Sequence, residues 1–329
     1  MNTRNWHILC WNVRGINATE KWDAVRDKIE ESASSIICLQ ETKRELFDAS
    51  YIRNFAPRCF DCFDFIPSLG ASGGILVLWN SVVFSGTVLD KQHFGMTMDF
   101  TSVHNNDAWK LTTVYGPCDE PARSEFVNWF HGHDIDDSMN WIFLGDFNFY
   151  RNLADTLIFN DAIGHLGLVE LPLKGRAFTW SNMQSEPLLE QLDWFFTSPN
   201  WTIDFPNTKV LPMAKITSDH IPSKIIISTN ILRANLFHFE NFWVEQDDFL
   251  DTVLDCWNIT PTLNDAARNI SSKFKALRAS LKHWSKHLSN LGLLISNCNQ
   301  VICFIDALED RCELYNPEAN LRYAVKRQL

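Results

Sequence analysis

Five short polar motifs stand where apolar runs of this sequence stop or start. They are WNVRG at 11–15, LQET at 39–42, VYGP at 114–117, LGDFN at 144–148 and SDH at 218–220. Each places a carboxylate, amide, phenol or imidazole at a predicted strand end, where layered α/β proteins build their sites. Taken singly, each motif also has a structural explanation, because a Glu after a strand is commonly a solvated loop residue and an Asn a turn former.

Together these side chains describe the hydrolysis of a phosphodiester. Glu41 and Asp219 are hard oxygen donors, which suit Mg²⁺ held by one or two carboxylates, water and phosphate. Asp146 could accept a proton from an attacking water. Asn148, which lies on the same side of an extended chain, could hold a phosphate oxygen.

An imidazole completes this set. His220 could accept a proton or bind a phosphoryl oxygen, and Asp193 in the segment LDWFF could orient its ring. A metal for the developing charge, donors for the non-bridging oxygens and a base for the water are what phosphodiester cleavage requires.

The elements that must position these residues are short. Amphipathic spacing predicts helices at 21–31 and 121–129, and hairpins are expected to turn at 80–81 and 105–107. Strands are predicted at 7–11, 35–39, 73–79, 82–89, 96–103, 109–115, 140–144, 178–180, 192–196, 210–211 and 224–227. So many short strands with few helices favour an α/β layered sandwich over a strictly alternating βαβ fold.

The chain changes character from Asn264 onwards. Apolar residues alternate at spacings of four and three from Ile270 to Ile305, an a/d seam interrupted by Gly292. This pattern predicts a long helix or helical hairpin with one apolar face; a dimeric coiled coil is the alternative. A run of basic residues without acids lies on the same stretch, at Arg268, Lys273, Lys275, Arg278, Lys282 and Lys286. A fragment ending near Asn230 is expected to fold and to keep its activity.

Composition excludes several classes of protein. The chain has 329 residues, a net charge of −11 and 46% hydrophobic residues, which argues against disorder and against a general nucleic-acid coat protein. Nine scattered Cys predict reduced thiols and no zinc site, even though Cys59 and Cys62 form one CxxC. No signal peptide and no membrane span are expected.

The ordered set WNVRG, QET, VYGP, GDFN, LDWFF and SDH resembles the endonuclease/exonuclease/phosphatase superfamily of exonuclease III, abasic-site endonucleases and DNase I. Arg14, residues 71–79 and residues 178–182 are most similar to the endonuclease domain of plant LINE-type non-LTR retrotransposon polyproteins. The resemblance implies a DNase I-like four-layered α/β/β/α sandwich of two packed mixed β-sheets. It divides the chain into that domain at 6–228, an aromatic connector at 229–262 and a helical tail at 263–329, a truncated link towards an absent reverse transcriptase.

The resemblance also implies roles for individual residues. It makes Glu41 the direct metal ligand, supported by Asn12 and Asp219. It implies that Asp146 activates or positions the nucleophile and that His220, paired with Asp193, contacts the scissile phosphate. The implied substrate-binding residues are Arg14, Tyr115, Asn148, Trp180 and Ser218.

Three residues depart from the superfamily pattern. Repair enzymes carry an acid two residues after the Asn, where this chain has Arg14, which cannot bind metal; this argues against strict abasic-site repair. Trp194 stands where relatives often have Arg or Tyr, and Glu190 lies three residues before Asp193, where its charge opposes the approach of DNA.

The resemblance therefore predicts an Mg²⁺-dependent endonuclease, with Mn²⁺ as the alternative metal, that nicks DNA and derives from a truncated LINE-type retroelement. One alternative is an inactive relic that acts through its helical tail, and another is the same fold acting on RNA or a small phosphate ester. DNA is the expected partner, with a helix–helix partner along 270–305, no membrane and no small-molecule cofactor. A reducing intracellular compartment, with the nucleus as a candidate, is the expected location.

Overall fold

The computed structural model describes residues 4–70, 72–136, 138–149, 153–184, 186–215, 217–231, 237, 239, 241–259, 265–288, 290–312 and 314–328. Contacts divide the chain into two units. The first comprises Met1–Leu232 together with Val301–Gln328, and the second comprises Arg233–Gln300. The predicted motifs all lie in the first unit.

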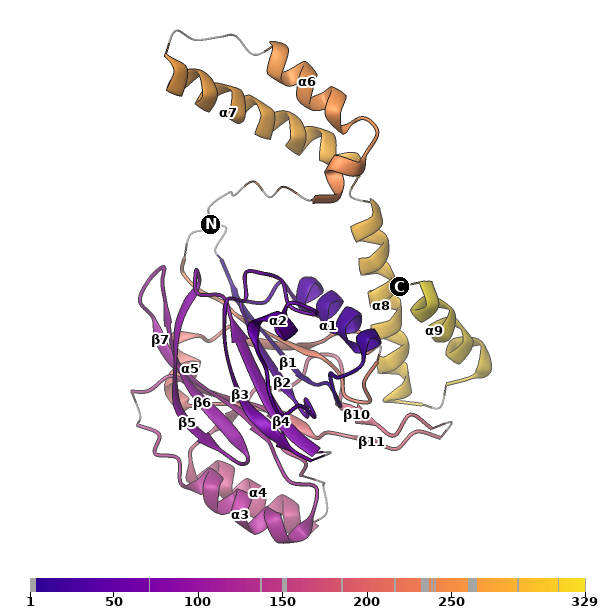
Figure 1. The fold of residues 1–329 in the computed structure, drawn as a ribbon. Helices are drawn as coiled ribbons and strands as arrows, with labels where there is room; N and C mark the ends of the chain where they lie inside the picture. The colour runs from indigo at the N-terminus through magenta and orange to yellow at the C-terminus, as the bar shows by residue number, and fades with distance from the viewer. Residues whose placement is uncertain are drawn as a thin grey trace. The chain divides into compact units, whose positions relative to one another are not determined.

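Two six-stranded mixed sheets form the centre of the first unit (Figure 1). The first sheet has the order β13 (Lys209–Pro212), β14 (Ser223–Ile227), β1 (Trp6–Asn12), β2 (Ile36–Gln40), β4 (Ser72–Trp79) and β3 (Cys62–Leu69). The second has the order β5 (Phe84–Gln92), β6 (Gly95–Ser102), β7 (Ala108–Tyr115), β8 (Trp141–Asp146), β12 (Asp193–Thr197) and β9 (Val169–Glu170).

Strand periodicity explains why the two sheets pack face to face. Along β1, Ile8 and Cys10 point into the core between the sheets, whereas Leu9 and Trp11 point to the opposite face. Strand β8 behaves in the same way, since Ile142 and Leu144 enter the core while Phe143 faces outwards. Because side chains alternate with a period of two, each central strand buries both of its faces.

Helices cover the two outward faces. The helix α1 (Thr19–Ser32) packs Val25 and Ile29 against the first sheet, where α2 (Ala49–Ile52) also lies. The helices α3 (Glu120–His131) and α4 (Leu153–His165) cover the second sheet with Phe126, Phe130 and Phe159 (Figure 1). The expected four-layered α/β/β/α sandwich is therefore confirmed.

One predicted hairpin is wrong. The strands on either side of Asn80-Ser81 do not pair, because β4 pairs with β2 and β3 while β5 pairs with β6 in the other sheet. Residues 80–83 instead carry the chain from one sheet to the other. The strand that forms a hairpin with β4 is β3, which precedes it in the chain. Asp64 and Pro67 interrupt the apolar pattern of β3, so the sequence does not reveal this strand. The hairpin turning at 105–107 is confirmed, since β6 pairs with β7.

The second unit is helical. It contains η1 (Asn241–Glu245), α6 (Phe249–Ile259), α7 (Ala266–Trp284), η2 (Ser285–His287) and the beginning of α8 (Asn290–Glu309). Trp243, Leu281 and Trp284 form its core, with Phe237 and Phe249 packed against them. The aromatic residues of the connector thus pack on α7, although residues 232–236, 238, 240 and 260–264 of that segment lie outside the described residues.

The apolar seam of the tail is divided between the two units. Leu281 and Trp284 are buried in the second unit, whereas Ile302 and Ile305 are buried in the first. The seam is therefore not one continuous helix: α7 ends at Trp284, and η2 separates it from α8. Ile270 and Phe274 are about half exposed.

A buried ion-pair cluster attaches the end of the chain to the sandwich. Arg176 donates to Asp310 through Nε (3.2 Å) and Nη2 (2.8 Å), and its Nη1 lies 3.4 Å from Asp306 Oδ2. The helix α9 (Asn316–Gln328) joins the cluster because Arg322 donates to Glu309 (2.8 Å and 3.0 Å) and to Asp306 (3.1 Å). A fragment ending near Asn230 would leave the Arg176 guanidinium, which is almost fully buried, without these carboxylates.

All nine cysteines are free, which agrees with the expected reduced thiols. Within the described part of the chain, no helix combines the length and the apolar character needed to cross a lipid bilayer.

We expect Asp310→Ala to lower the free energy of unfolding by about 3 kcal/mol, since it strips a buried guanidinium of its bidentate acceptor. Urea unfolding followed by tryptophan fluorescence measures this loss. Asp27→Ala, which removes an exposed carboxylate of α1, is the matched control and should change stability by less than about 0.5 kcal/mol. Equal effects of the two substitutions would show that the cluster does not hold the tail to the sandwich.

Candidate active site

Strand register brings the polar motifs to one end of the sandwich. Asn12 at the end of β1 lies opposite Gln40 at the end of the parallel strand β2. In the other sheet, Tyr115 lies opposite Asp146 at the ends of the parallel pair β7 and β8, and Asp146 lies opposite Asp193 at the start of β12. Because β14 runs antiparallel to β1, the SDH segment that precedes β14 reaches the same end.

The backbone takes special conformations at these strand ends. Arg14, Glu41 and Asn148 have φ of +50°, +52° and +52°, in the left-handed region that non-glycine residues rarely adopt. A Cβ on Gly116 would lie 2.1 Å from the carbonyl oxygen of Phe147, and one on Gly145 would lie 2.1 Å from that of Val114. The glycines of VYGP and GDFN therefore permit the close backbone approach that sets Asp146 beside Tyr115.

Asn12 links the two sheets through its carboxamide. Its Nδ2 donates to Glu41 Oε2 (3.1 Å) and to Asp146 Oδ2 (2.7 Å), and its Oδ1 accepts from the backbone N–H of Arg14 (3.1 Å). Asn12 is fully buried, so each of these bonds replaces a lost bond to water. One amide thereby holds two acidic side chains from different sheets.

Two cations lie against the Glu41 carboxylate. Lys43 Nζ is 3.0 Å and Arg14 Nε is 3.6 Å from Glu41 Oε1. The Arg14 guanidinium also donates to Asp219 Oδ2, which accepts a further bond from Trp180 Nε1 (2.8 Å). Arg14 thus stands between the two carboxylates that the sequence predicts as metal ligands.

His220 lies between two other carboxylates. Its Nδ1 is 2.9 Å from Asp193 Oδ2, and its Nε2 is 3.6 Å from Asp146 Oδ2. All three residues are buried, and Asp193 is oriented by Thr179, whose Oγ1 accepts from the backbone N–H of Asp193 (2.9 Å). The predicted pairing of His220 with Asp193 is present in the geometry.

Burial and charge shift the pKa values of this group. Burial raises the pKa of Asp146 to about 7, opposed by the neighbouring His220 and by the amide of Asn12. Burial alone would lower the pKa of His220, but the carboxylates of Asp193 and Asp146 raise it to about 9. His220 is therefore an imidazolium at neutral pH, a hydrogen-bond donor on both ring nitrogens, and Asp146 is the group whose pKa suits a base.

The raised pKa of His220 makes the stability of the protein depend on pH. Since this pKa lies above the ordinary value of 6.5 for a histidine, the contribution of His220 to stability is complete below that value and is lost as the pH rises through about 9.

The remaining predicted residues surround this centre. Asn148 Nδ2 donates to the carbonyl of Gly116 (2.8 Å), and the Asn148 N–H donates to Asp146 Oδ1 (3.0 Å). Ser218 Oγ donates to the carbonyl of Asn12 (2.8 Å), which ties the SDH segment to β1. Burial and the nearby Glu41 raise the pKa of Tyr115, so its phenol stays neutral and can donate to an anion.

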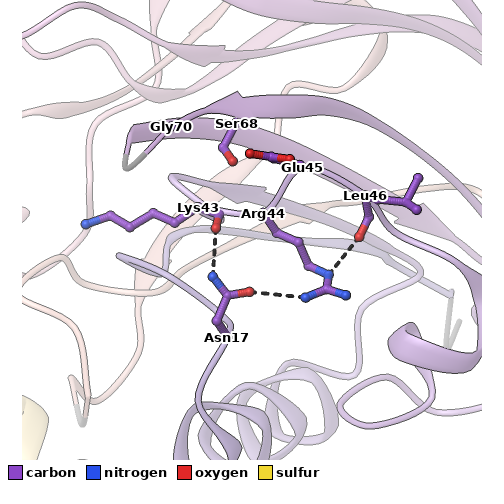
Figure 2. Close-up of a pocket in the computed structure, with 7 residues that line it drawn as sticks. All are labelled: Asn17, Lys43, Arg44, Glu45, Leu46, Ser68 and Gly70. Carbon is purple, nitrogen blue, oxygen red and sulfur yellow. Dashed lines mark hydrogen bonds between the residues drawn. The ribbon is translucent and has the colours of Figure 1, made fainter.

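Two hollows flank the site. A cavity of about 330 Å³ is lined by Tyr115, Gly116 and Cys118 together with Gly73 and Gly74 of β4. A second pocket, of about 320 Å³, lies beside Lys43 (Figure 2). Asn17 accepts from Arg44 and donates to the Lys43 carbonyl there, and the Lys43 side chain points away from Arg44, which leaves its ammonium for Glu41.

Sequence reasoning missed three positioning residues. Lys43 directly follows the QET motif, so its proximity to Glu41 could have been predicted from the sequence. Lys21 donates to the carbonyls of Val13 (3.1 Å) and Thr217 (2.7 Å) and so joins two motif-bearing loops, and Thr179 orients Asp193. Lys21 belongs to no recognisable pattern. Thr179 lies in the segment 178–182 that carries part of the resemblance, but only the folded chain shows its contact with Asp193.

The position between Glu41 and Asp219 fits a divalent cation. Both carboxylates already face one positive group, the Arg14 guanidinium, and carboxylate oxygens are the donors that Mg²⁺ prefers. Asp146, Asp193 and His220 also lie close enough to share an ion. The His220 ring between them is buried, whereas the Arg14 side chain between Glu41 and Asp219 is 43% exposed and free to move aside, so we expect the cation at Glu41 and Asp219.

Comparison with known proteins agrees with this arrangement. The model of the Endonuclease/Exonuclease/phosphatase family matches residues 9–220, a span that contains the motifs and the contacts described above. No curated protein matches the chain.

Solved structures share the fold at low sequence identity. An AP endonuclease from Leishmania major is 18% identical, with a TM-score of 0.52 over 69% of this chain and 88% of that one. The catalytic domain of Xenopus laevis APE2 is 15% identical, with a TM-score of 0.52 over 70% and 94%. The endonuclease domain of TRAS1, a telomere-specific non-LTR retrotransposon, is 13% identical, with a TM-score of 0.50 over 68% and 98%.

We expect the pKa of His220 in the metal-free protein to lie above neutrality and to fall by about 1 to 3 units in Asp193→Asn, because the variant removes an opposing charge beside the ring. Imidazole NMR signals followed against pH measure it, with His220→Ala assigning the resonance. Asp161→Asn, at an exposed position of α4, is the control and should leave the titration unchanged. A His220 that titrates near 6.5 in both the wild type and Asp193→Asn would refute the charge arrangement.

Proposed function

This chain belongs to the endonuclease/exonuclease/phosphatase family, and we propose that it is a metal-dependent phosphodiesterase that nicks DNA. The observation that carries the proposal is the continuous run of contacts from Glu41 through Asn12 and Asp146 to His220 and Asp193. These residues comprise a candidate cation site, a base and an imidazolium at one end of the sandwich.

Each group has a role that its surroundings support. Glu41 and Asp219 would hold Mg²⁺, or Mn²⁺ in its place, and the ion would neutralise charge that develops on the phosphate. Asp146, with a pKa of about 7, takes a proton from the attacking water. The His220 imidazolium donates to a non-bridging oxygen, and Asp193 holds the ring in position.

The surrounding polar groups suit a phosphodiester substrate. Tyr115 offers a neutral phenol, and the backbone N–H of Asn148 donates to the Asp146 carboxylate. Arg14 and Lys43 supply positive charge where a phosphate would approach. Arg14, whose side chain is 43% exposed, would be available to the substrate if an ion took over one of its two carboxylates.

The LINE-type origin is also a proposal. It rests on the similarity of Arg14 and of residues 71–79 and 178–182 to plant retrotransposon endonucleases, a resemblance of sequence alone. The alternative is an inactive relic that acts through its helical tail, and an assay for metal-dependent nicking separates it from the proposal.

Glu41→Gln keeps the shape of the side chain and removes the charge that a divalent cation needs. We expect nicking of supercoiled plasmid DNA in Mg²⁺ to fall at least about a hundredfold. The matched control is Glu45→Gln, four residues on and exposed, which should nick as the wild type does.

A Glu41→Gln variant that nicks plasmid at the wild-type rate would show that Glu41 takes no part in the chemistry. If the wild-type protein does not nick DNA but hydrolyses RNA or a small phosphate ester in the same buffer, the substrate is not DNA. No turnover of any of the three would favour the relic.

A further inference from the structure

A cavity lined by several basic residues lies next to the candidate active site and has no part in the active-site contacts described above. It has a volume of about 610 Å³, and its walls come from both ends of the first unit. One wall holds Ser181, Met183 and Lys215 of the sandwich. The other holds Arg322, Tyr323, Lys326 and Arg327 of α9 together with one acid, Glu309 of α8.

The wall that α9 supplies is fixed in place. Arg322 makes a bidentate pair with Glu309 of α8 and also bonds Asp306, and Asp306 and Asp310 bind the buried Arg176 of the sandwich. The cations of α9 are therefore presented by a helix that is held by buried ion pairs.

Arg322 is paired with Glu309, but three other cations of the lining form no such pair, and the charges of Asp306 and Glu309 act on two of them, Lys215 and Lys326, only through space. Lys215 is 2% exposed, yet it forms no hydrogen bond or ion pair with the described residues, as is also true of Lys326 and Arg327. Burial lowers the pKa of Lys215 to about 8, so it is still charged at neutral pH. A buried ammonium without a partner is unfavourable, and an anion in the cavity would relieve that cost.

The position of the cavity beside the active site indicates that its ligand is part of a polymeric anion. Ser181 lines it, and the Ser181 N–H donates to the carbonyl of Asp219 (3.1 Å), while the neighbouring Trp180 bonds the Asp219 carboxylate. A strand whose phosphate lies at His220 would thus have its next phosphates near this cavity. Tyr323, 71% exposed, offers an aromatic face beside the cations.

We propose that this cavity is a phosphate-binding extension of the active site, in which Lys215, Lys326 and Arg327 contact the backbone of duplex DNA flanking the cleaved bond. The identity of the polymer rests on the proposed function. The extension makes the end of the chain a part of the substrate-binding surface, and it places local positive charge on a protein whose net charge is −11.

Fluorescence anisotropy with a labelled DNA duplex, in EDTA so that no cleavage occurs, tests this on the full chain at several salt concentrations. We expect Lys326→Gln/Arg327→Gln to bind about tenfold more weakly and to reduce the slope of log K against log salt by about 2. Lys215→Met, which keeps the length of the side chain, should reduce the slope by about 1. The control is Lys275→Gln/Arg278→Gln on α7, which removes the same charge from two exposed positions and should bind as the wild type does.

Each outcome decides the proposal. Unchanged affinity and slope in the α9 double variant, or an equal loss in the α7 control, overturns it and leaves the proposed nicking activity standing. A wild-type protein that binds inorganic phosphate but no duplex also overturns it. Duplex binding that depends on Lys215, Lys326 and Arg327, without any nicking of plasmid by the wild type, supports the extension and contradicts the proposed function instead.

Discussion

Four carboxylates share one end of this sandwich, and the need to compensate their charge governs the rest of the site. Glu41, Asp146 and Asp193 are buried, and Asp219 is half-buried. Such groups repel one another and lose hydration, so each needs a donor or a cation. The protein supplies the His220 imidazolium for Asp146 and Asp193, and Arg14 and Lys43 for Glu41 and Asp219. Asn12 joins the two halves.

The fold meets this need through register and close packing. Parallel pairing of β1 with β2 and of β7 with β8 sends strand ends of the two sheets to one edge, and the antiparallel strands β12 and β14 begin there. Gly116 and Gly145 allow the backbones of the VYGP and GDFN segments to approach each other. Arg14, Glu41 and Asn148 adopt left-handed backbone conformations where the strands end. Strain at these positions is offset by the large apolar cores on both sides of the sheets.

The residues that meet in the polar centre could be picked out from the sequence because they sit in short motifs at the ends of apolar runs, whereas their chemical roles stay predictions. The sequence could not reveal Lys21, Thr179 or Lys215, whose roles depend on contacts between segments far apart in the chain. The hairpin proposed at Asn80-Ser81 failed because a turn signal between two apolar runs does not tell whether they share a sheet. The heptad seam likewise gave no sign that Ile302 and Ile305 pack on the sandwich while Leu281 and Trp284 pack elsewhere, since periodicity marks a buried face and not its partner.

The central claim is that a cation belongs between Glu41 and Asp219 and not in the histidine cluster. Anomalous X-ray diffraction from crystals grown with Mn²⁺ tests it directly, because the signal locates the ion without reference to activity. We predict one peak in contact with the carboxylates of Glu41 and Asp219, with the Arg14 guanidinium moved away from at least one of them and His220 still bonded to Asp193. A peak in contact with Asp146, Asp193 and His220, with Arg14 still bridging Glu41 and Asp219, would contradict it.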